Sequence, residues 1–284
     1  MNGFINCNKP SKMTSSDVVC RIKRLCKGNK IGHMGTLDPG AAGVLPIAIG
    51  KATRLFDFLT HKKKIYRARF TYGKTTDTLD SYGKLLQTSD IIPNKEQLEN
   101  ILGEFIGNIM QMPPLYSALK VNGAKAYDLA RKNIDFELKA RNVEVFNFTL
   151  NKQIAIDTFE FDIECGGGTY IRSLVRDTAE KLGTVGYMSS LIRLKSGVFD
   201  IIESKTIDEI EQDFEGALLP MDFALNGLRK VYIPNELSKA ALNGMYVPLE
   251  AENGENVLIY VDGELLGIAQ SDKGRMELKC YLRV

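Results

Sequence analysis

Apolar residues recur every three or four positions in several stretches of the chain, which is the period of a helix packed on one side. The first such stretch covers residues 14–27, where Thr14 is among the candidate capping residues. In residues 95–106 the apolar stripe follows Asn94, and Gln97 is placed to complete a capping box with it. The same period predicts three further helices, over residues 124–132, 169–182 and 206–214.

Other stretches alternate between apolar and polar residues, which is the pattern of a strand buried on one face. Residues 64–72 are the clearest case, since four alternate positions are small or aromatic: Tyr66, Ala68, Phe70 and Tyr72. Further strands are expected near residues 142–149, 156–165 and 191–199. Glycine-rich residues 30–43 are expected to be a loop, and residues 107–120, with their Pro-Pro pair, irregular chain.

A domain boundary is expected between Pro220 and Gly227, and the residues after it are expected to be mostly strands. A helix is expected near residues 235–243, and strands near residues 229–233, 256–262, 265–271 and 276–283. The irregular alternation of elements predicts an α+β fold with a mixed, largely antiparallel sheet and flanking helices. A small, mostly β, barrel-like module of fewer than 60 residues is expected to follow it.

Charge is distributed unevenly along a chain whose formal net charge is only +2 over 284 residues. Residues 1–150 contain 23 Lys and Arg against 13 Asp and Glu, whereas residues 151–227 contain 7 against 14. Basic residues in the first half come in two bursts, over 21–30 and 62–69, and aromatic side chains follow the second burst. This pattern suits a surface for phosphates and unstacked bases, although a solvated helix face and a charged loop would give it too.

Cysteine content, apolar stretches and the first residues indicate the cellular compartment in which the protein is expected. The five cysteines are scattered without a C-x-x-C pair, which indicates free thiols in a reducing compartment, and no structural zinc site is expected. The longest apolar stretch, residues 44–49, is far shorter than the roughly 20 residues of a membrane span. Since the first residues also lack an apolar signal core, the sequence predicts a soluble cytoplasmic protein.

The most unusual segment is the loop GHMGTLDPGAAGVLP, residues 32–46. Asp38-Pro39-Gly40 alone would be an ordinary turn. Here four glycines surround one histidine and one aspartate, and glycine lets the backbone approach a ligand closely. A carboxylate held in such a bend can act as a nucleophile or as a general base.

This loop closely resembles the catalytic motif of the TruB family, the pseudouridine synthases that modify the T loop of transfer RNA. The resemblance extends over most of the chain, in several blocks that follow the family's order. They are Asn8-Lys9-Pro10 with Thr14-Ser15, and residues 32–46, 64–83, 111–131, 165–183 and 190–199. Residues 111–131 resemble the insert with which the family grips RNA, and the C-terminal segment resembles a PUA-type RNA-binding module.

The resemblance implies a role for each matching residue. Asp38 would be the nucleophile, Arg172 would pair with it and orient it, and Tyr66 would stack on the target base and act as a base in proton removal. Tyr170 and Leu191 would line the uridine pocket, and His33 would fill space left in the RNA loop by flipped nucleotides. Three further substrate-binding positions are implied: Lys9, Pro10 and Asp80. Apart from the resemblance, Tyr66 and Leu191 could be core residues and Arg172 a surface arginine.

The resemblance also implies two domains, a catalytic domain over residues 1–225 with a thumb insert at about 108–144, and a PUA-like module over residues 226–284. The implied reaction isomerises uridine 55 of tRNA after base flipping, with no metal or cofactor, because nothing is oxidised and no group is imported. The expected partner is the T arm of tRNA, bound by a monomer that needs no protein partner. A tRNA-folding chaperone role is compatible with this activity. The alternatives are a non-catalytic RNA binder and a guide-RNA-dependent relative.

Overall fold

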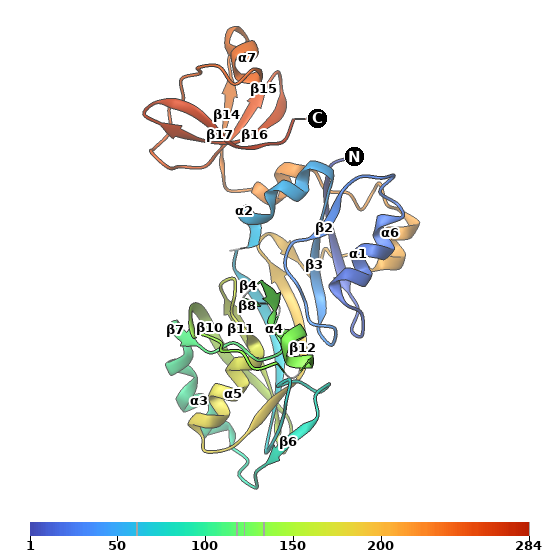
Figure 1. Ribbon diagram of the computed structural model, residues 1–284, viewed down its shortest axis with the longest axis vertical. Coiled ribbons are helices and arrows are strands. Elements are labelled where there is room, and N and C mark those ends of the chain that lie inside the picture. Colours follow the sequence, from blue (N-terminus) through green and yellow to red (C-terminus); the bar gives the residue numbers. More distant parts are fainter. Residues whose placement is uncertain (61, 118, 122, 133, 284) are drawn as a thin grey trace.

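A nine-stranded sheet runs through the long body of the molecule in the computed structural model (Figure 1). The structure describes residues 1–60, 62–117, 119–121, 123–132 and 134–283. Seven strands follow one another in the order β1 (Gly3–Lys9), β3 (Ala42–Ile49), β12 (Gly186–Ser196), β4 (Lys64–Tyr72), β11 (Thr158–Cys165), β10 (Arg141–Ala155) and β7 (Gly107–Gln111). Two short strands extend it, β2 (Ile31–His33) beside β3 and β13 (Phe199–Asp200) beside β12. Among the described strands of this sheet, only the β3–β12 pair is parallel, which confirms the predicted mixed, largely antiparallel sheet.

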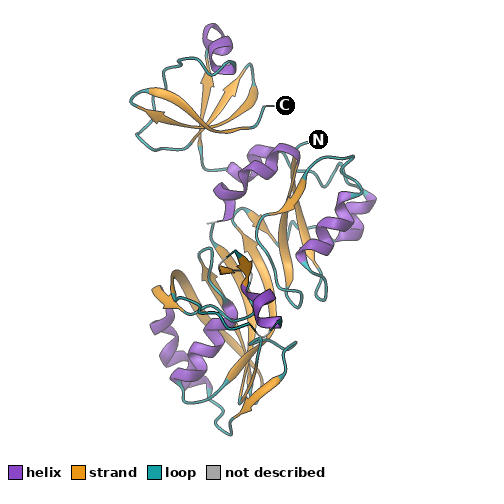
Figure 2. Ribbon diagram, viewed as in Figure 1, coloured by secondary structure: helices purple, strands orange, loops and turns teal. Residues whose placement is uncertain are grey.

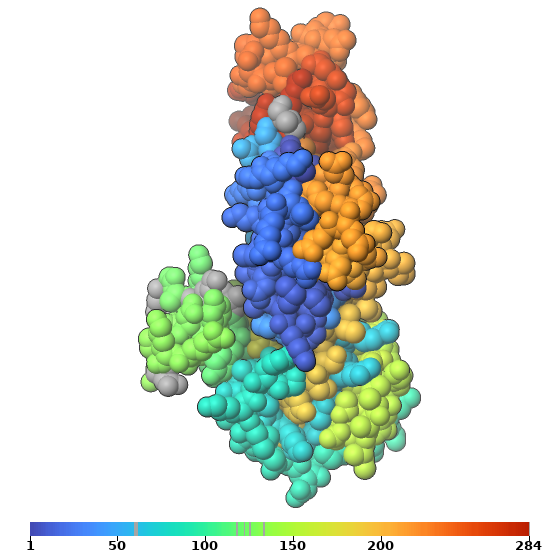
Figure 3. All heavy atoms as spheres, turned by 90° about the vertical axis from the view of Figure 1, so that its right-hand side faces the viewer, coloured from blue at the N-terminus to red at the C-terminus, as the bar shows by residue number. Residues whose placement is uncertain are grey.

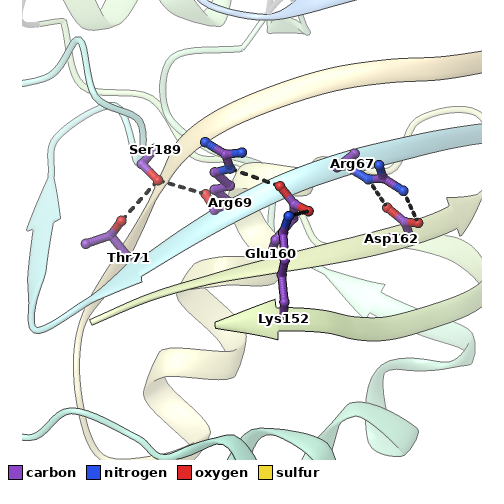
Figure 4. A network of polar contacts seen from close by, with 7 residues as sticks. All are labelled: Arg67, Arg69, Thr71, Lys152, Glu160, Asp162 and Ser189. Atoms are coloured by element: carbon purple, nitrogen blue, oxygen red, sulfur yellow. Dashed lines mark hydrogen bonds and ion pairs between the residues drawn. The ribbon is translucent and has the colours of Figure 1, made fainter. Parts of the chain in front are cut away.

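Strand β4 lies in the middle of the sheet, between β12 and β11, and its bounds are those that the alternation predicts. Its residues Tyr66, Ala68, Phe70 and Tyr72 are all buried. On the opposite face, Arg67 forms two hydrogen bonds of 2.8 Å with Asp162 of β11, and Arg69 pairs with Glu160 (Figure 4). The alternation therefore separates an apolar face from a face of paired charges.

Helices pack against the apolar face of the sheet and around its ends (Figure 2). α5 (Ile171–Lys181) buries Leu174, Val175 and Ala179 in the main core. The other helices of the body are α1 (Ser15–Lys23), α2 (Phe56–Thr60), α3 (Lys95–Leu102) and α6 (Ile207–Gln212), with 3-10 turns at Gly50–Leu55, Gly103–Phe105 and Met221–Leu225. Thr14 and Asn94 begin α1 and α3 with complete capping boxes, as Asn94 and Gln97 were predicted to do.

Three segments differ from the sequence-based expectation. The glycine-rich stretch 30–43 includes strand β2, and the stretch 107–120 includes strand β7, so the prediction of loop and irregular chain was wrong there. Both strands are short, and each has one partner strand, β3 for β2 and β10 for β7. Pairing with that partner, and not a local sequence pattern, therefore makes these residues extended. The first helix also ends at Lys23, earlier than expected, because the chain after it closes three-residue turns, in which the N–H groups of Leu25 and Cys26 donate to the carbonyls of Ile22 and Lys23.

Two smaller substructures project from the body. A hairpin of β5 (Lys74–Thr76) and β6 (Leu85–Thr88) follows β4. Between β7 and β10, an insert contains β8 (Lys120–Val121), β9 (Ala124–Lys125) and α4 (Ala126–Arg131), and it extends sideways from the body in green (Figure 3). Residues 118, 122 and 133 of the predicted thumb lie outside the described residues.

The C-terminal residues form a separate four-stranded sheet in the order β14 (Arg229–Ile233), β15 (Val257–Val261), β16 (Glu264–Asp272) and β17 (Arg275–Tyr281), with α7 (Asn235–Leu242) beside it (Figure 1). All five elements fall within a few residues of their predicted positions. Its own core includes Ile233, Val247 and Ile259, and Tyr260 donates a 2.9 Å hydrogen bond to Asp222 at the connection. Among the described residues, no helix is long and apolar enough to cross a membrane.

Candidate active site

The loop between β2 and β3 is fixed by side chains from the start of the chain. The hydroxyl of Ser15 donates to the carbonyl of Leu37 at 3.0 Å and accepts from its N–H at 2.9 Å. The ammonium of Lys9, which is fully buried, donates to the carbonyl of Pro39 at 3.3 Å, and Ser11 donates to Gly40 at 3.0 Å. These contacts lie on both sides of Asp38, so its backbone is held in place before any ligand binds.

Asp38 forms an ion pair with Arg172, the second residue of α5, with 2.9 Å between Oδ2 and Nε. The same guanidinium donates from Nη1 to the carbonyl of Thr78 and from Nη2 to that of Tyr116, both at 2.9 Å. Its Nη1 also lies 3.9 Å from the carboxylate of Asp80. The Arg172 side chain is 6% exposed and that of Asp38 is 36% exposed. A buried guanidinium with several fixed partners therefore orients a carboxylate that is partly open to solvent.

A cavity of about 300 Å³ opens beside this ion pair. Five residues predicted from the sequence line it together: Asp38, Tyr66, Tyr170, Arg172 and Leu191. They come from the β2–β3 loop, β4, the start of α5 and β12, which are distant in sequence and adjacent in the sheet. A carboxylate, an arginine, two tyrosines and an apolar wall suit a planar polar ring that is held against an aromatic face.

The two tyrosines are held in different ways. Tyr66 is almost completely buried, and this burial raises the pKa of its hydroxyl, although the nearby charge of Arg193 opposes the change. Tyr170 caps α5, where Gln111 of β7 accepts from its N–H at 2.8 Å and donates to its carbonyl at 3.1 Å. Burial also raises the pKa of the Tyr170 hydroxyl, although the nearby charge of Arg172 opposes the change. Both phenols therefore stay in the neutral form at physiological pH.

The remaining predicted residues lie outside the cavity lining. Asp80 accepts from Thr78 Oγ1 at 2.6 Å and lies behind Arg172. Lys9 lies beneath the loop, where burial lowers its pKa to about 8 while the charge of Asp38 acts in the opposite direction. His33 lies on β2 opposite Ile47, and Pro10 is exposed in the turn after β1.

Two basic residues that the sequence analysis did not select also line the cavity: Lys64 and Arg193. Arg193 is 1% exposed and donates to the carbonyls of Val44 at 2.7 Å and Gly35 at 3.2 Å, at the two ends of the Asp38 loop. Burial lowers the pKa of Lys64 to about 8, and the charge of Arg193 adds to the effect. One feature of the sequence could have identified Arg193: it shares a strand face with Leu191, and a charged residue at an inward position must be paired or hydrogen-bonded.

Comparison with known proteins places the whole chain in one family. A family model described as "TruB family pseudouridylate synthase (N terminal domain)" matches residues 23–171, more than half of the chain. The tRNA pseudouridine synthase B of Alkaliphilus oremlandii is 38% identical over 276 residues, which cover 94% of this chain and 92% of that protein. That of a Caulobacter species is 42% identical over 83% of this chain and 78% of that protein.

A solved structure supports the same assignment. A chain in the crystal structure of a Cbf5-Nop10-Gar1 complex superposes with a TM-score of 0.75 and 27% identity, over 99% of this chain and 85% of that one. Within the described residues, no group of three or more His, Cys, Asp and Glu side chains is arranged to hold a metal ion. The family model over more than half of the chain and the relatives of 38% and 42% identity show that the chain belongs to the TruB family of pseudouridylate synthases, a class of isomerases.

Proposed function

We propose that the protein converts uridine 55 in the T loop of tRNA to pseudouridine, as a cytoplasmic monomer that needs no protein partner, metal ion or cofactor. The observation that carries this proposal is the Asp38–Arg172 ion pair at the mouth of a cavity lined by Tyr66, Tyr170 and Leu191. Binding of RNA alone would not need a carboxylate there, because a carboxylate repels phosphates. The substrate is suggested by the relatives of 36–42% identity, which are named tRNA pseudouridine synthase B.

In the proposed reaction the bond from C1′ to N1 of the uridine breaks, the uracil turns, and C1′ bonds to C5. The proton on C5 is lost to solvent and N1 takes up a proton, so the product is an isomer of the substrate. Asp38 acts as the nucleophile, and Arg172 holds its carboxylate in a fixed orientation at the cavity. Asp80 would balance the charge of Arg172 from behind. Lys9 would support the loop through the carbonyl of Pro39, with Pro10 continuing the turn beside the RNA.

Tyr66 would stack on the flipped uracil, with Tyr170 and Leu191 completing the pocket. Its ring lies on the apolar face of β4 and its raised pKa favours the neutral phenol, which supports stacking more than removal of a proton. Stacking of a base on an aromatic ring contributes about 1–3 kcal/mol, which offsets part of the cost of extracting the base. His33, on β2 below the loop, would fill the space that flipped nucleotides leave in the RNA.

We further propose that residues 1–225 form the catalytic domain, that residues 108–144 form a thumb on the RNA, and that residues 226–284 form a PUA-like RNA-binding module. The sideways projection of the insert and the separate C-terminal sheet support this division (Figures 1 and 3). A stand-alone enzyme is favoured over a guide-dependent one because the chain is 38% identical to a tRNA pseudouridine synthase B and 27% identical to the chain from the Cbf5 complex.

The direct test is release of tritium from a tRNA transcript that carries 5-tritiated uridine, without added metal or cofactor. The protein should release one equivalent from the unmodified transcript and none of it from a matched transcript with cytidine at position 55. Equal release from both transcripts would show that the proposed position is wrong. Failure to release tritium from either transcript, with tight RNA binding, would favour the non-catalytic or the guide-dependent alternative.

Binding of tRNA is expected to depend steeply on salt, because basic side chains displace counterions from the phosphates. With about four or more phosphate contacts, raising monovalent salt from 50 to 200 mM should weaken binding by about 50-fold or more. Filter binding or fluorescence anisotropy across a salt titration measures this slope. An affinity that does not change with salt would contradict a phosphate-binding surface.

We also propose a tRNA-folding chaperone role, because the cavity can receive only a base that has left its stack, so the RNA must open before the reaction. Opening and refolding do not require the nucleophile. A variant without the Asp38 carboxylate should therefore still accelerate correct folding of a misfolded transcript, as native gel electrophoresis can measure. Folding assistance that disappears together with catalysis would contradict this role.

A further inference from the structure

Tyr82 lies beside the loop that carries Asp38, at the rim of the candidate active site and outside the cavity lining. It lies in the turn of the β5–β6 hairpin, and its side chain is 59% exposed. Its ring covers the backbone of Gly40, two residues after Asp38, so closely that a methyl group at Gly40 would lie 2.2 Å from Cε2 of the ring. An exposed aromatic ring is thus fixed against the loop that carries the nucleophile.

The turn holds Tyr82 in place through its backbone. The N–H of Tyr82 donates to Oδ1 of Asp80 at 3.0 Å, and that oxygen also accepts from Thr78. The turn is joined to the main sheet where the N–H of Met188 donates to the carbonyl of Leu79 at 3.0 Å. Since the ring is positioned before a ligand arrives, binding on it would cost little conformational entropy.

A second loop brings a positive charge to the same rim. The turn after β1 is bound to the catalytic loop, since Ser11 donates to the carbonyl of Gly40 and the N–H of Lys12 to that of Pro39. Lys12 is exposed, and it forms no ion pair with any residue that the structure describes. Figure 3 shows the blue N-terminal segment meeting the teal segment that follows β4, beside the green insert.

We propose that Tyr82 and Lys12 form a nucleotide subsite at the rim of the active site. The exposed face of the Tyr82 ring stacks on an unpaired base of the RNA next to the target uridine, and the ammonium of Lys12 binds the adjoining phosphate. This inference rests on the proposed function, because it takes RNA as the ligand of the cavity. A ring and a cation together are what single-stranded RNA requires, since every base has an aromatic face and every linkage a negative charge.

Three substitutions of Tyr82 separate stacking from packing on Gly40. Tyr82→Phe keeps the ring, Tyr82→Leu keeps an apolar cover, and Tyr82→Ala removes both. Binding is measured with the full chain carrying Asp38→Asn, so that no turnover occurs, on tRNA transcripts with 2-aminopurine at each nucleotide next to position 55. Leu85→Ala, an exposed position on the same hairpin, is the matched control.

We expect Tyr82→Leu and Tyr82→Ala to weaken binding by about 5-fold or more, and Tyr82→Phe and Leu85→Ala by less than about twofold. One 2-aminopurine position should be quenched on binding, and this quenching should survive only with an aromatic residue. In chains with an intact Asp38, Tyr82→Leu should raise KM and leave kcat within about twofold. Lys12→Gln should reduce the salt slope of binding by about one.

Other results would overturn the inference. Equal binding and quenching by the Phe, Leu and Ala variants would exclude stacking. A fall in kcat with Tyr82→Ala that Tyr82→Leu restores, at unchanged KM, would show that the ring only covers the catalytic loop. If the unsubstituted protein released no tritium from any transcript, the proposed function would fail, whereas the binding and quenching comparison would still decide the subsite.

Discussion

Asp38→Asn is expected to lower the rate of tritium release from tRNA by on the order of 10⁴-fold or more, the scale on which loss of a catalytic nucleophile acts. The amide has nearly the shape of the carboxylate but no negative charge, so it cannot bond to the sugar or the base. Single-turnover release at saturating protein measures the chemical step without product release.

The same substitution should leave the affinity for tRNA within a few fold. Arg172 keeps its bonds to the carbonyls of Thr78 and Tyr116 and its proximity to Asp80, so the cavity should retain its shape. Removing a negative charge next to phosphates should, if anything, favour binding. A variant that loses RNA binding together with turnover would show that Asp38 has a structural or binding role instead.

A matched control for Asp38→Asn is available on the other face of the sheet. Asp162 is also paired with an arginine, Arg67, at 2.8 Å, but this pair lies on the face of β4 and β11 opposite Tyr66 (Figure 4). Asp162→Asn should therefore leave tritium release within about twofold, since neither partner of this pair lines the cavity. A similar loss in both variants would indicate a general effect of removing an ion pair from the sheet.

Local patterns in the sequence were sufficient for most of the fold. The alternation at Tyr66 to Tyr72 and the caps at Thr14 and Asn94 act through neighbouring residues, and the structure has these elements where they were expected. Strands β1, β2, β3 and β7 were not predicted. β1 and β3 are buried at nearly every position, so they lack the alternation that marks β4, and β2 and β7 are too short to show a pattern. Arg193 was missed because its partners are backbone carbonyls of a distant loop, which the sequence does not reveal, so its inward position on a strand was the one available signal.

The distribution of charge along the sequence was the poorest guide to the charge of the folded surface. The basic burst over residues 62–69 indicates a polyanion-binding surface in sequence, but β11 brings Asp162 and Glu160 to Arg67 and Arg69 (Figure 4). Lys63 likewise pairs with Glu164, and Arg21 of the first burst pairs with Asp208 and Glu211. The acidic stretch after residue 150 thus neutralises part of the basic half. A phosphate-binding surface must therefore draw on basic residues such as Lys12 that have no carboxylate partner in the described chain.

Arg172→Met should lower kcat by about 100-fold or more, because a carboxylate that is no longer held can move by about 1 Å from its productive position. The substitution also leaves the carboxylates of Asp38 and Asp80 without their shared cation and two backbone carbonyls without their donor. Asp38 is partly open to solvent, so the free energy of unfolding should fall by less than the roughly 3–5 kcal/mol lost when a fully buried pair loses one partner. Activity is therefore compared well below the thermal transition of each variant.

Two further variants, Arg172→Lys and Arg67→Met, separate the orienting role of Arg172 from its positive charge and from a general loss of protein stability. Lysine keeps the positive charge but cannot bind two carbonyls and a carboxylate with a planar fork, so kcat should stay low even where the variant is folded. Arg67→Met also removes an arginine that is paired with a carboxylate, but on the opposite face of the sheet, and should leave kcat unchanged. Full activity of Arg172→Lys would mean that the cavity needs only a cation beside Asp38. The geometry of three bonds of 2.9 Å around one guanidinium argues instead that its direction matters as much as its charge.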